Sequence, residues 1–144
     1  MGNFFTIGDK AIKKDNIIEA GIYSFNFPAE KKINDTPNKL AEIMCAFAGQ
    51  DYFKYNTETC EILVVNVSSL SGDIDIYIIH NSDELCKTIN TAYERLNDGK
   101  FTLDGNIAAT DFDRVLANFL CKYKDINFTY TEKNLKEIFN EITQ

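Results

Sequence analysis

The stretch Cys60–His80, CEILVVNVSSLSGDIDIYIIH, decides the fold. It holds two β-rich runs, 61–67 and 73–79, around a five-residue break with the sequence SSLSG. Two such runs around a short break that ends in glycine predict an antiparallel hairpin. The first run is apolar at successive positions and therefore on both faces, as expected of a strand that is covered on both sides in the middle of a sheet.

The second run of the hairpin has two unlike faces. One face carries only isoleucines, which are Ile74, Ile76 and Ile78. The other face carries Asp73, Asp75, Tyr77 and Ile79. Because successive side chains of a strand point to opposite faces, the aspartate end of this second face is expected to be partly exposed to water.

Apolar residues at helical spacing predict four helices, each preceded by a Ser or Thr that can cap its first turn. The helices are expected at 37–48, 83–97, 111–123 and 132–142, with caps at Thr36, Ser82, Thr110 and Thr131. Further strands are expected at 3–7, 21–27, 101–103 and 126–130, and Pro28 is expected to end the second of them. Residues 8–20 show neither the helical nor the strand periodicity clearly, so no element is predicted there.

Together these elements predict an α+β fold in one domain, residues 1–144. The expected sheet is mixed but mainly antiparallel, with five or six strands built around the central hairpin. Because the predicted helices are apolar on one side, they are expected to cover the sheet and to leave a polar face to water.

The charge and the cysteine content of the chain argue against some classes of function. The net charge is −7, and residues 55–144 hold eight basic against fifteen acidic side chains. Such a surface repels phosphate backbones, so direct nucleic-acid binding is disfavoured. The four cysteines have no metal-ligand spacing and fall in or at the start of apolar patterns, which indicates reduced thiols and a cytoplasmic protein. No apolar run is long enough to cross a bilayer.

Asp73 and Asp75 are spaced to share one face of a strand, where two carboxylates can hold a hard cation such as Mg²⁺. The residues GDIDIYII resemble the Asp-x-Asp strand of the nucleotidyltransferase family, in which this pair holds the metal of a nucleoside triphosphate and a third acid completes the site. The family's Gly-Ser motif upstream of that strand is missing here. Two acids at a solvated strand start account for the same residues.

A second resemblance involves the residues DGNIAATDF, 104–112, which are similar to the second half of an EF-hand or dockerin calcium loop. The resemblance implies Asp104 and Asp111 as ligands. The first half departs from the pattern, because Lys100 and Thr102 stand where such a loop has acids. An Asp-Gly turn followed by a Thr N-cap explains the same residues without calcium, and we expect no bound metal or cofactor.

Nucleophilic catalysis has little basis in the sequence. His80 is the single imidazole of the chain, and a nucleophile at Ser82 or Cys86 would need to lie within hydrogen-bonding reach of it. A histidine at the end of a strand is more often structural. No glycine-rich phosphate loop is present either.

The sequence therefore favours a binding or inhibitor module over an enzyme. In general character the chain resembles small immunity proteins, antitoxins and phage-encoded inhibitors. Its acidic part would mask a basic, nucleic-acid-handling surface of a protein partner, without contacting nucleic acid or membrane itself. The residues expected to contact that partner are Asp73, Asp75, Tyr77, Asp104 and Asp111.

Two other functions stay open from the sequence. One is a metal-dependent nucleotidyl or phosphoryl transferase that uses Asp73 and Asp75 with Asp104 or Asp111 as the third ligand. The other is a structural or assembly subunit. The oligomeric state is left open as well.

Overall fold

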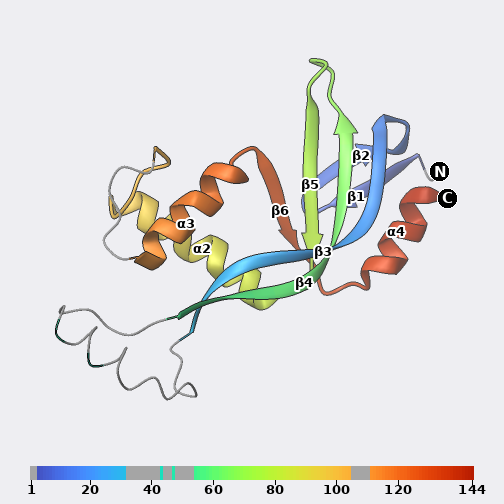
Figure 1. Cartoon of the computed structure of the whole chain (residues 1–144). Coiled ribbons are helices and arrows are strands. Elements are labelled where there is room, and N and C mark those ends of the chain that lie inside the picture. The colour runs from blue at the N-terminus through green and yellow to red at the C-terminus, as the bar shows by residue number, and fades with distance from the viewer. Residues whose placement is uncertain (1–2, 32–42, 44–46, 48–53, 105–110) are drawn as a thin grey trace.

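The predicted hairpin forms the middle of the sheet (Figure 1). The computed structural model describes residues 3–31, 43, 47, 54–104 and 111–144. Its main sheet has four strands in the order β3-β4-β5-β6, of which the first three are antiparallel and β6 is parallel to β5. Their bounds are Ile17–Lys31 for β3, Lys54–Ser68 for β4, Ile74–His80 for β5 and Ile126–Tyr130 for β6.

The N-terminal strands do not join this sheet. Strands β1 (Phe4–Ile7) and β2 (Lys10–Lys13) pair with each other as a separate two-stranded hairpin. Gly8, with φ of 58°, supplies the left-handed backbone of their turn. The 3₁₀ turn η1 (Lys14–Asn16) then leads into β3. The expectation of one sheet with five or six strands is therefore wrong in its count, although the α+β class and the mixed sheet are confirmed.

Strand β3 is longer than predicted because Pro28 does not end it. Pro28 pairs with Thr57, and the strand continues to Lys31. Since β3 is the outermost strand of the sheet, a proline there can turn its missing N–H away from the neighbouring strand. The resulting β3–β4 ribbon is much longer than the 21–27 and 61–67 runs indicated.

The helices follow the predicted pattern except at their ends. Helix α2 (Asp83–Asn97) has the predicted bounds, and the Ser82 side chain accepts from the Leu85 N–H as the expected cap. Helix α3 (Asp111–Lys122) ends one residue early. Helix α4 (Leu135–Thr143) begins three residues later than expected, because Asn134 and not Thr131 caps it. The predicted helix 37–48 lies almost entirely outside the described residues. The predicted cap at Thr110 also lies outside them.

The predicted strand 101–103 is wrong. These residues form no strand, and Phe101 is instead 1% exposed within the cluster beneath α2 and α3. The apolar side chain that suggested a strand is buried because it anchors the connection between two helices. A run of three residues cannot distinguish these two outcomes.

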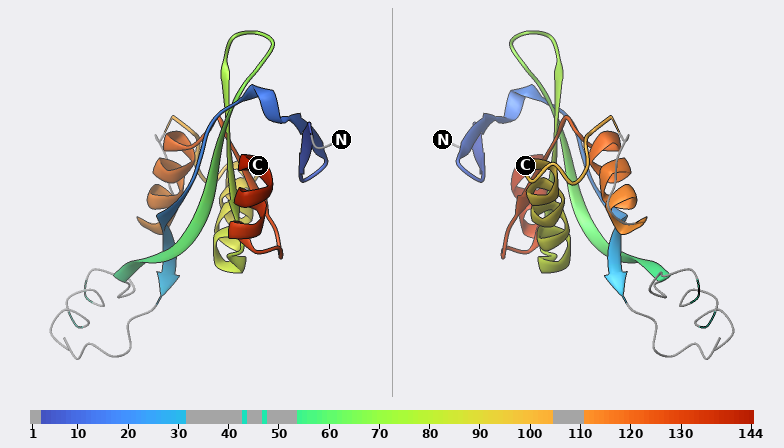
Figure 2. Two further views of the ribbon diagram at one scale, coloured as in Figure 1. Left: turned by 90° about the vertical axis from the view of Figure 1, so that its right-hand side faces the viewer. Right: turned by 90° about the vertical axis from the view of Figure 1, so that its left-hand side faces the viewer.

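The main sheet is covered on both faces. One core contains Ile62 and Ile78 with α2 and α3, and the other contains Leu63 and Val65 with the β1–β2 hairpin and α4. Figure 2 shows α3 and the N-terminal hairpin on opposite sides of the sheet. Strand β4 is thus buried on both faces of the sheet, as its apolar sequence predicted.

Two ion pairs involving α3 should differ in their contribution to stability. Arg95 Nη1 of α2 lies 2.8 Å from Asp113 Oδ1, and Asp113 is 0% exposed, whereas the Arg114–Asp111 pair is exposed and spans 3.8 Å. Removing the cation beside a buried carboxylate costs about 3 kcal/mol, while exposed pairs contribute less than about 1 kcal/mol.

We therefore expect Arg95→Gln to lower the free energy of unfolding by about 3 kcal/mol, and the control Arg114→Gln to lower it by less than about 1 kcal/mol. Urea unfolding followed by circular dichroism measures both values. Equal losses would contradict the structural role assigned to the buried pair.

Candidate functional site

The β4–β5 hairpin extends beyond the helices that cover the sheet (Figures 1 and 2). Its turn is ordered by hydrogen bonds, since Ser69 N donates to Asp73 O at 2.9 Å and Ser71 Oγ donates to Asp73 Oδ2 at 3.2 Å. Gly72 has φ of 88°, a conformation that disfavours other residues. Asp73 and Asp75 are both exposed, as predicted for the wet end of the strand.

Apolar side chains are exposed beside these carboxylates. Leu70 at the turn is fully exposed, and Ile74 is 59% exposed. Burial begins further along β5, where Tyr77, Ile78, Ile79 and His80 are all buried. The hairpin therefore has a buried base and a free acidic tip.

A hollow of about 580 Å³ lies beside this tip. It is lined by Lys10, Asp73, Ile74, Asp75, Tyr77, Asp125 and Asn127. Asp125 was not singled out in the sequence. It precedes β6, and the parallel pairing of β6 with β5 brings it to the same hollow as Asp73 and Asp75.

The other predicted contact residues are placed differently. Tyr77 is only 6% exposed, with its ring in the core beneath the N-terminal hairpin and Lys10 Nζ 5.8 Å from the ring centroid. Tyr77 can therefore contact a partner only through the small part of its surface that lines a hollow, such as the hollow of Asp73 and Asp75. Asp104 lies in the α2–α3 connection and Asp111 begins α3, and neither lines the hollow of Asp73 and Asp75.

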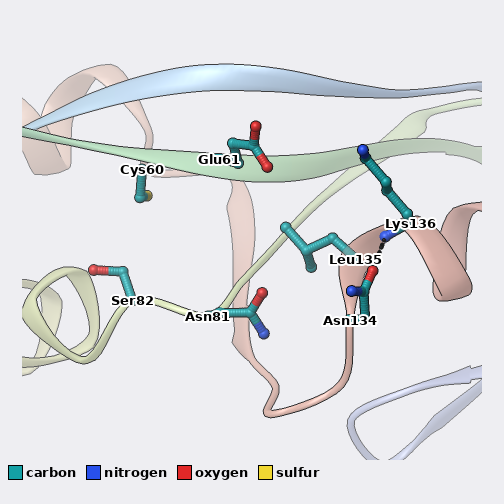
Figure 3. Close-up of a pocket in the computed structure, with 7 residues that line it drawn as sticks. All are labelled: Cys60, Glu61, Asn81, Ser82, Asn134, Leu135 and Lys136. Carbon is teal, nitrogen blue, oxygen red and sulfur yellow. Dashed lines mark hydrogen bonds between the residues drawn. The ribbon is translucent and has the colours of Figure 1, made fainter.

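A second hollow, of about 500 Å³, lies where β5 ends and α2 and α4 begin (Figure 3). It is lined by Cys60, Glu61, Asn81, Ser82, Asn134, Leu135 and Lys136. Three of its polar side chains form hydrogen bonds with the backbone. Ser82 Oγ caps α2, Asn134 Oδ1 caps α4, and Asn81 Nδ2 donates to the carbonyls of Thr131 and Lys133.

The groups that could act as nucleophile or base in this region are poorly suited to that chemistry. Burial raises the pKa of the Cys60 thiol, which keeps it protonated near neutral pH. Burial also lowers the pKa of His80, whose ring packs edge-on against Tyr130 with a centroid distance of 6.0 Å. A buried neutral imidazole of this kind is typical of a core residue.

The carboxylates do not form a metal centre within the part of the chain that the structure describes. No group of three or more His, Cys, Asp or Glu side chains there is arranged to hold a metal ion. Asp73, Asp75 and Asp125 line one hollow without converging on one point. Asp73 already accepts a hydrogen bond from Ser71.

Comparisons with known proteins give no relative: no family model matches the chain, and no curated protein or solved structure matches it either. None of the helices described here has the length and apolar character needed to span a bilayer.

The buried state of His80 generates a pH prediction. Because its folded pKa is lowered, the unfolded chain takes up a proton near pH 6.5 that the folded chain does not, so stability falls as the pH drops below that value. We expect the free energy of unfolding to fall between pH 7.5 and 5.5, with a slope of at most about 1.4 kcal/mol per pH unit.

Substitution His80→Gln should flatten this slope, as measured by urea unfolding at a series of pH values. Since the chain has one histidine, its titration can also be followed by NMR without assignment ambiguity. A folded-state midpoint at or above 6.5 would contradict the prediction.

Proposed function

We propose that this chain is a small acidic protein-binding module that occupies a basic surface of another protein. The observation that carries the proposal is the exposed tip of the β4–β5 hairpin, where Asp73 and Asp75 stand beside the exposed side chains of Leu70 and Ile74. Acids that flank exposed apolar side chains on a protruding element suit recognition, because the apolar groups gain by burial and the acids select a cationic partner.

The geometry of the tip supports this proposal further. Asp73 and Asp75 are two residues apart on β-type backbone, so their carboxylates are offset by roughly 7 Å along the strand. Asp125 adds a third carboxylate to the same hollow. The three carboxylates outnumber the one cation of the hollow, Lys10, so the hollow attracts lysine and arginine side chains. A partner that ordinarily binds phosphates has these side chains in excess.

The cysteines that the structure describes give an indication of the cellular compartment in which the protein works. Cys60, Cys86 and Cys121 are free and half-buried, which supports a reducing environment such as the cytoplasm. A partner in the same compartment that handles nucleic acid would present the basic surface that the acidic tip fits. Covering that surface would inhibit the partner by competition with its nucleic acid.

A second function is favoured by one observation: Asp73, Asp75 and Asp125 share a hollow, so a cation brought by a nucleoside triphosphate could recruit them into a transferase site. In that case Mg²⁺ or Mn²⁺ together with a triphosphate would raise the thermal unfolding temperature, and Asp75→Asn would abolish the shift. No shift at millimolar nucleotide would reject the transferase and leave the binding module.

The proposed binding function leads to a prediction about Asp73 and Asp75. In the double variant Asp73→Lys/Asp75→Lys, affinity for a basic partner should fall at least about tenfold, and the dependence of affinity on salt should flatten, because charge complementarity is lost. The matched control Glu137→Lys/Glu141→Lys makes the same change in net charge at exposed positions of α4 and should leave affinity nearly unchanged.

The partner is first captured from an extract of the source cells on the immobilised chain and then titrated against the variants at 50 to roughly 300 mM salt, a range over which exposed charges become strongly screened. Equal affinities of the two double variants would remove Asp73 and Asp75 from the binding site. Recovery of acidic partners alone would reject the proposed function itself.

A further inference from the structure

The two edges of the main sheet differ in how well they are protected against a further strand. Strand β3 carries Pro28 and has a register shift between Ile17 and Glu19, and both features discourage pairing at an edge. Strand β6, with the sequence INFTY, has no charge, no proline and an unbroken register with β5. Its edge is therefore the one suited to accept a strand.

The backbone of β6 has hydrogen-bonding groups that point away from β5. Thr131 N donates to His80 O at 2.9 Å, so the alternation of a parallel ladder turns the N–H groups of Asn127 and Thr129 toward β5 as well. The N–H and C=O groups of Phe128 and Tyr130 then face outward. Among the strands that the structure describes, β5 alone pairs with β6.

A hollow of about 470 Å³ runs beside β6. One wall is the α2 surface at Ile89, Asn90 and Tyr93, and the other is the β1–β2 turn at Gly8, Asp9 and Lys10. Residues 126–129 lie between these walls. An extended peptide placed here would pair with the backbone of β6 and set alternate side chains against each wall.

The charges along this groove are uneven. It shares Lys10, Tyr77 and Asn127 with the acidic hollow of Asp73, Asp75 and Asp125, which lies where β6 begins. Where β6 ends, an adjoining hollow is lined by Thr131 and Lys133. Asp83 and Glu132 lie close to Tyr130 at that end. The start of the groove, with three aspartates against Lys10, therefore favours cationic side chains more strongly than its end, where Lys133 offsets part of the negative charge.

We propose that the free edge of β6 accepts an extended segment of a partner protein as an added strand, with lysine or arginine side chains placed beside Asp73, Asp75 and Asp125. This inference rests on the proposed binding function and names the form of its partner: a peptide strand with a basic end. The backbone of β6 provides affinity, and the acids at its start set the direction and choice of the strand.

The test uses the full chain and two synthetic probes, each an uncharged alternating valine–threonine heptapeptide extended by two lysines at its amino end or at its carboxyl end. Each probe should bind at least about tenfold more tightly than the same heptapeptide extended by two serines, because parallel pairing brings amino-terminal lysines to the acids and antiparallel pairing brings carboxy-terminal lysines there. On binding, amide hydrogen exchange should slow at Phe128 and Tyr130, while amides on the outer edge of β3 stay unchanged.

Two sets of variants separate the backbone from the charges. Tyr130→Pro removes an outward N–H without touching the ladder to β5 and should weaken binding about tenfold, whereas Tyr130→Ala keeps that N–H and should weaken it less than about threefold. The triple variant Asp73→Asn/Asp75→Asn/Asp125→Asn should remove the advantage of the lysine-extended probes over the serine-extended heptapeptide.

Several outcomes would overturn the inference. These are no binding of either probe at millimolar concentration, protection of amides elsewhere, or equal effects of Tyr130→Pro and Tyr130→Ala. Concentration-dependent protection of Phe128 and Tyr130 without any probe would show a second copy of the chain on this edge instead. If the probes fail while Asp73→Lys/Asp75→Lys still weakens capture of the partner, the binding function stands and the added strand alone is rejected.

Discussion

Burial of β4 on both faces is the constraint on which the rest of the structure depends. Ile62 faces one core, and Leu63 and Val65 face the other, so neither face of the strand can be left to water without losing a large part of the hydrophobic stabilisation. A strand of this kind requires a covering layer on each side. The chain builds one layer from α2 and α3 and the other from its two ends, the β1–β2 hairpin and α4.

The position of the acidic tip follows from where those layers end. From Tyr77 toward the turn the cover on β5 ends: Ile76 is half-buried, and Asp75 and Ile74 are exposed. The sequence changes there from continuous apolar residues to isoleucines that alternate with Asp73 and Asp75, followed by the serines of the turn. A hairpin with a buried base and a hydrogen-bonded turn holds its tip in place without requiring burial of the tip itself. The exposed carboxylates are thus presented on a stiff support, which lowers the entropy lost when a partner binds.

Local patterns in the sequence predicted most of the described elements, but not their assembly. The hairpin and α2 were predictable because strand alternation and the Ser82 cap act over a few residues. Strand β1 was predicted within residues 3–7, but its partner β2 was not, since residues 8–20 show neither the helical nor the strand periodicity clearly. Phe101 was misassigned because an apolar side chain can be buried in a strand or in a connection between helices alike.

The candidate site shows the same limit. Asp73 and Asp75 could be placed at an exposed strand end from alternation alone. Asp125 could not be found, because it reaches their hollow through the parallel pairing of β5 with β6, which two intervening helices separate in the sequence. Tyr77 shares their face by alternation, but the N-terminal hairpin covers it, and nothing near Tyr77 in the sequence indicates that cover.

The hydrogen bonds of the hollow in Figure 3 differ from those at the edge of β6. Helices α2 and α4 leave the parallel strands β5 and β6 toward opposite faces, and this geometry opens the hollow of Figure 3 at the carboxyl end of β5, a common place for ligands in α/β sheets. Here, however, Ser82, Asn134 and Asn81 direct their polar atoms to the backbone. The outward backbone groups of Phe128 and Tyr130 have no such partner among the described strands and turns. Since backbone donors at an edge are satisfied most fully by another strand, this difference supports the proposal that a partner binds along β6 and not in that hollow.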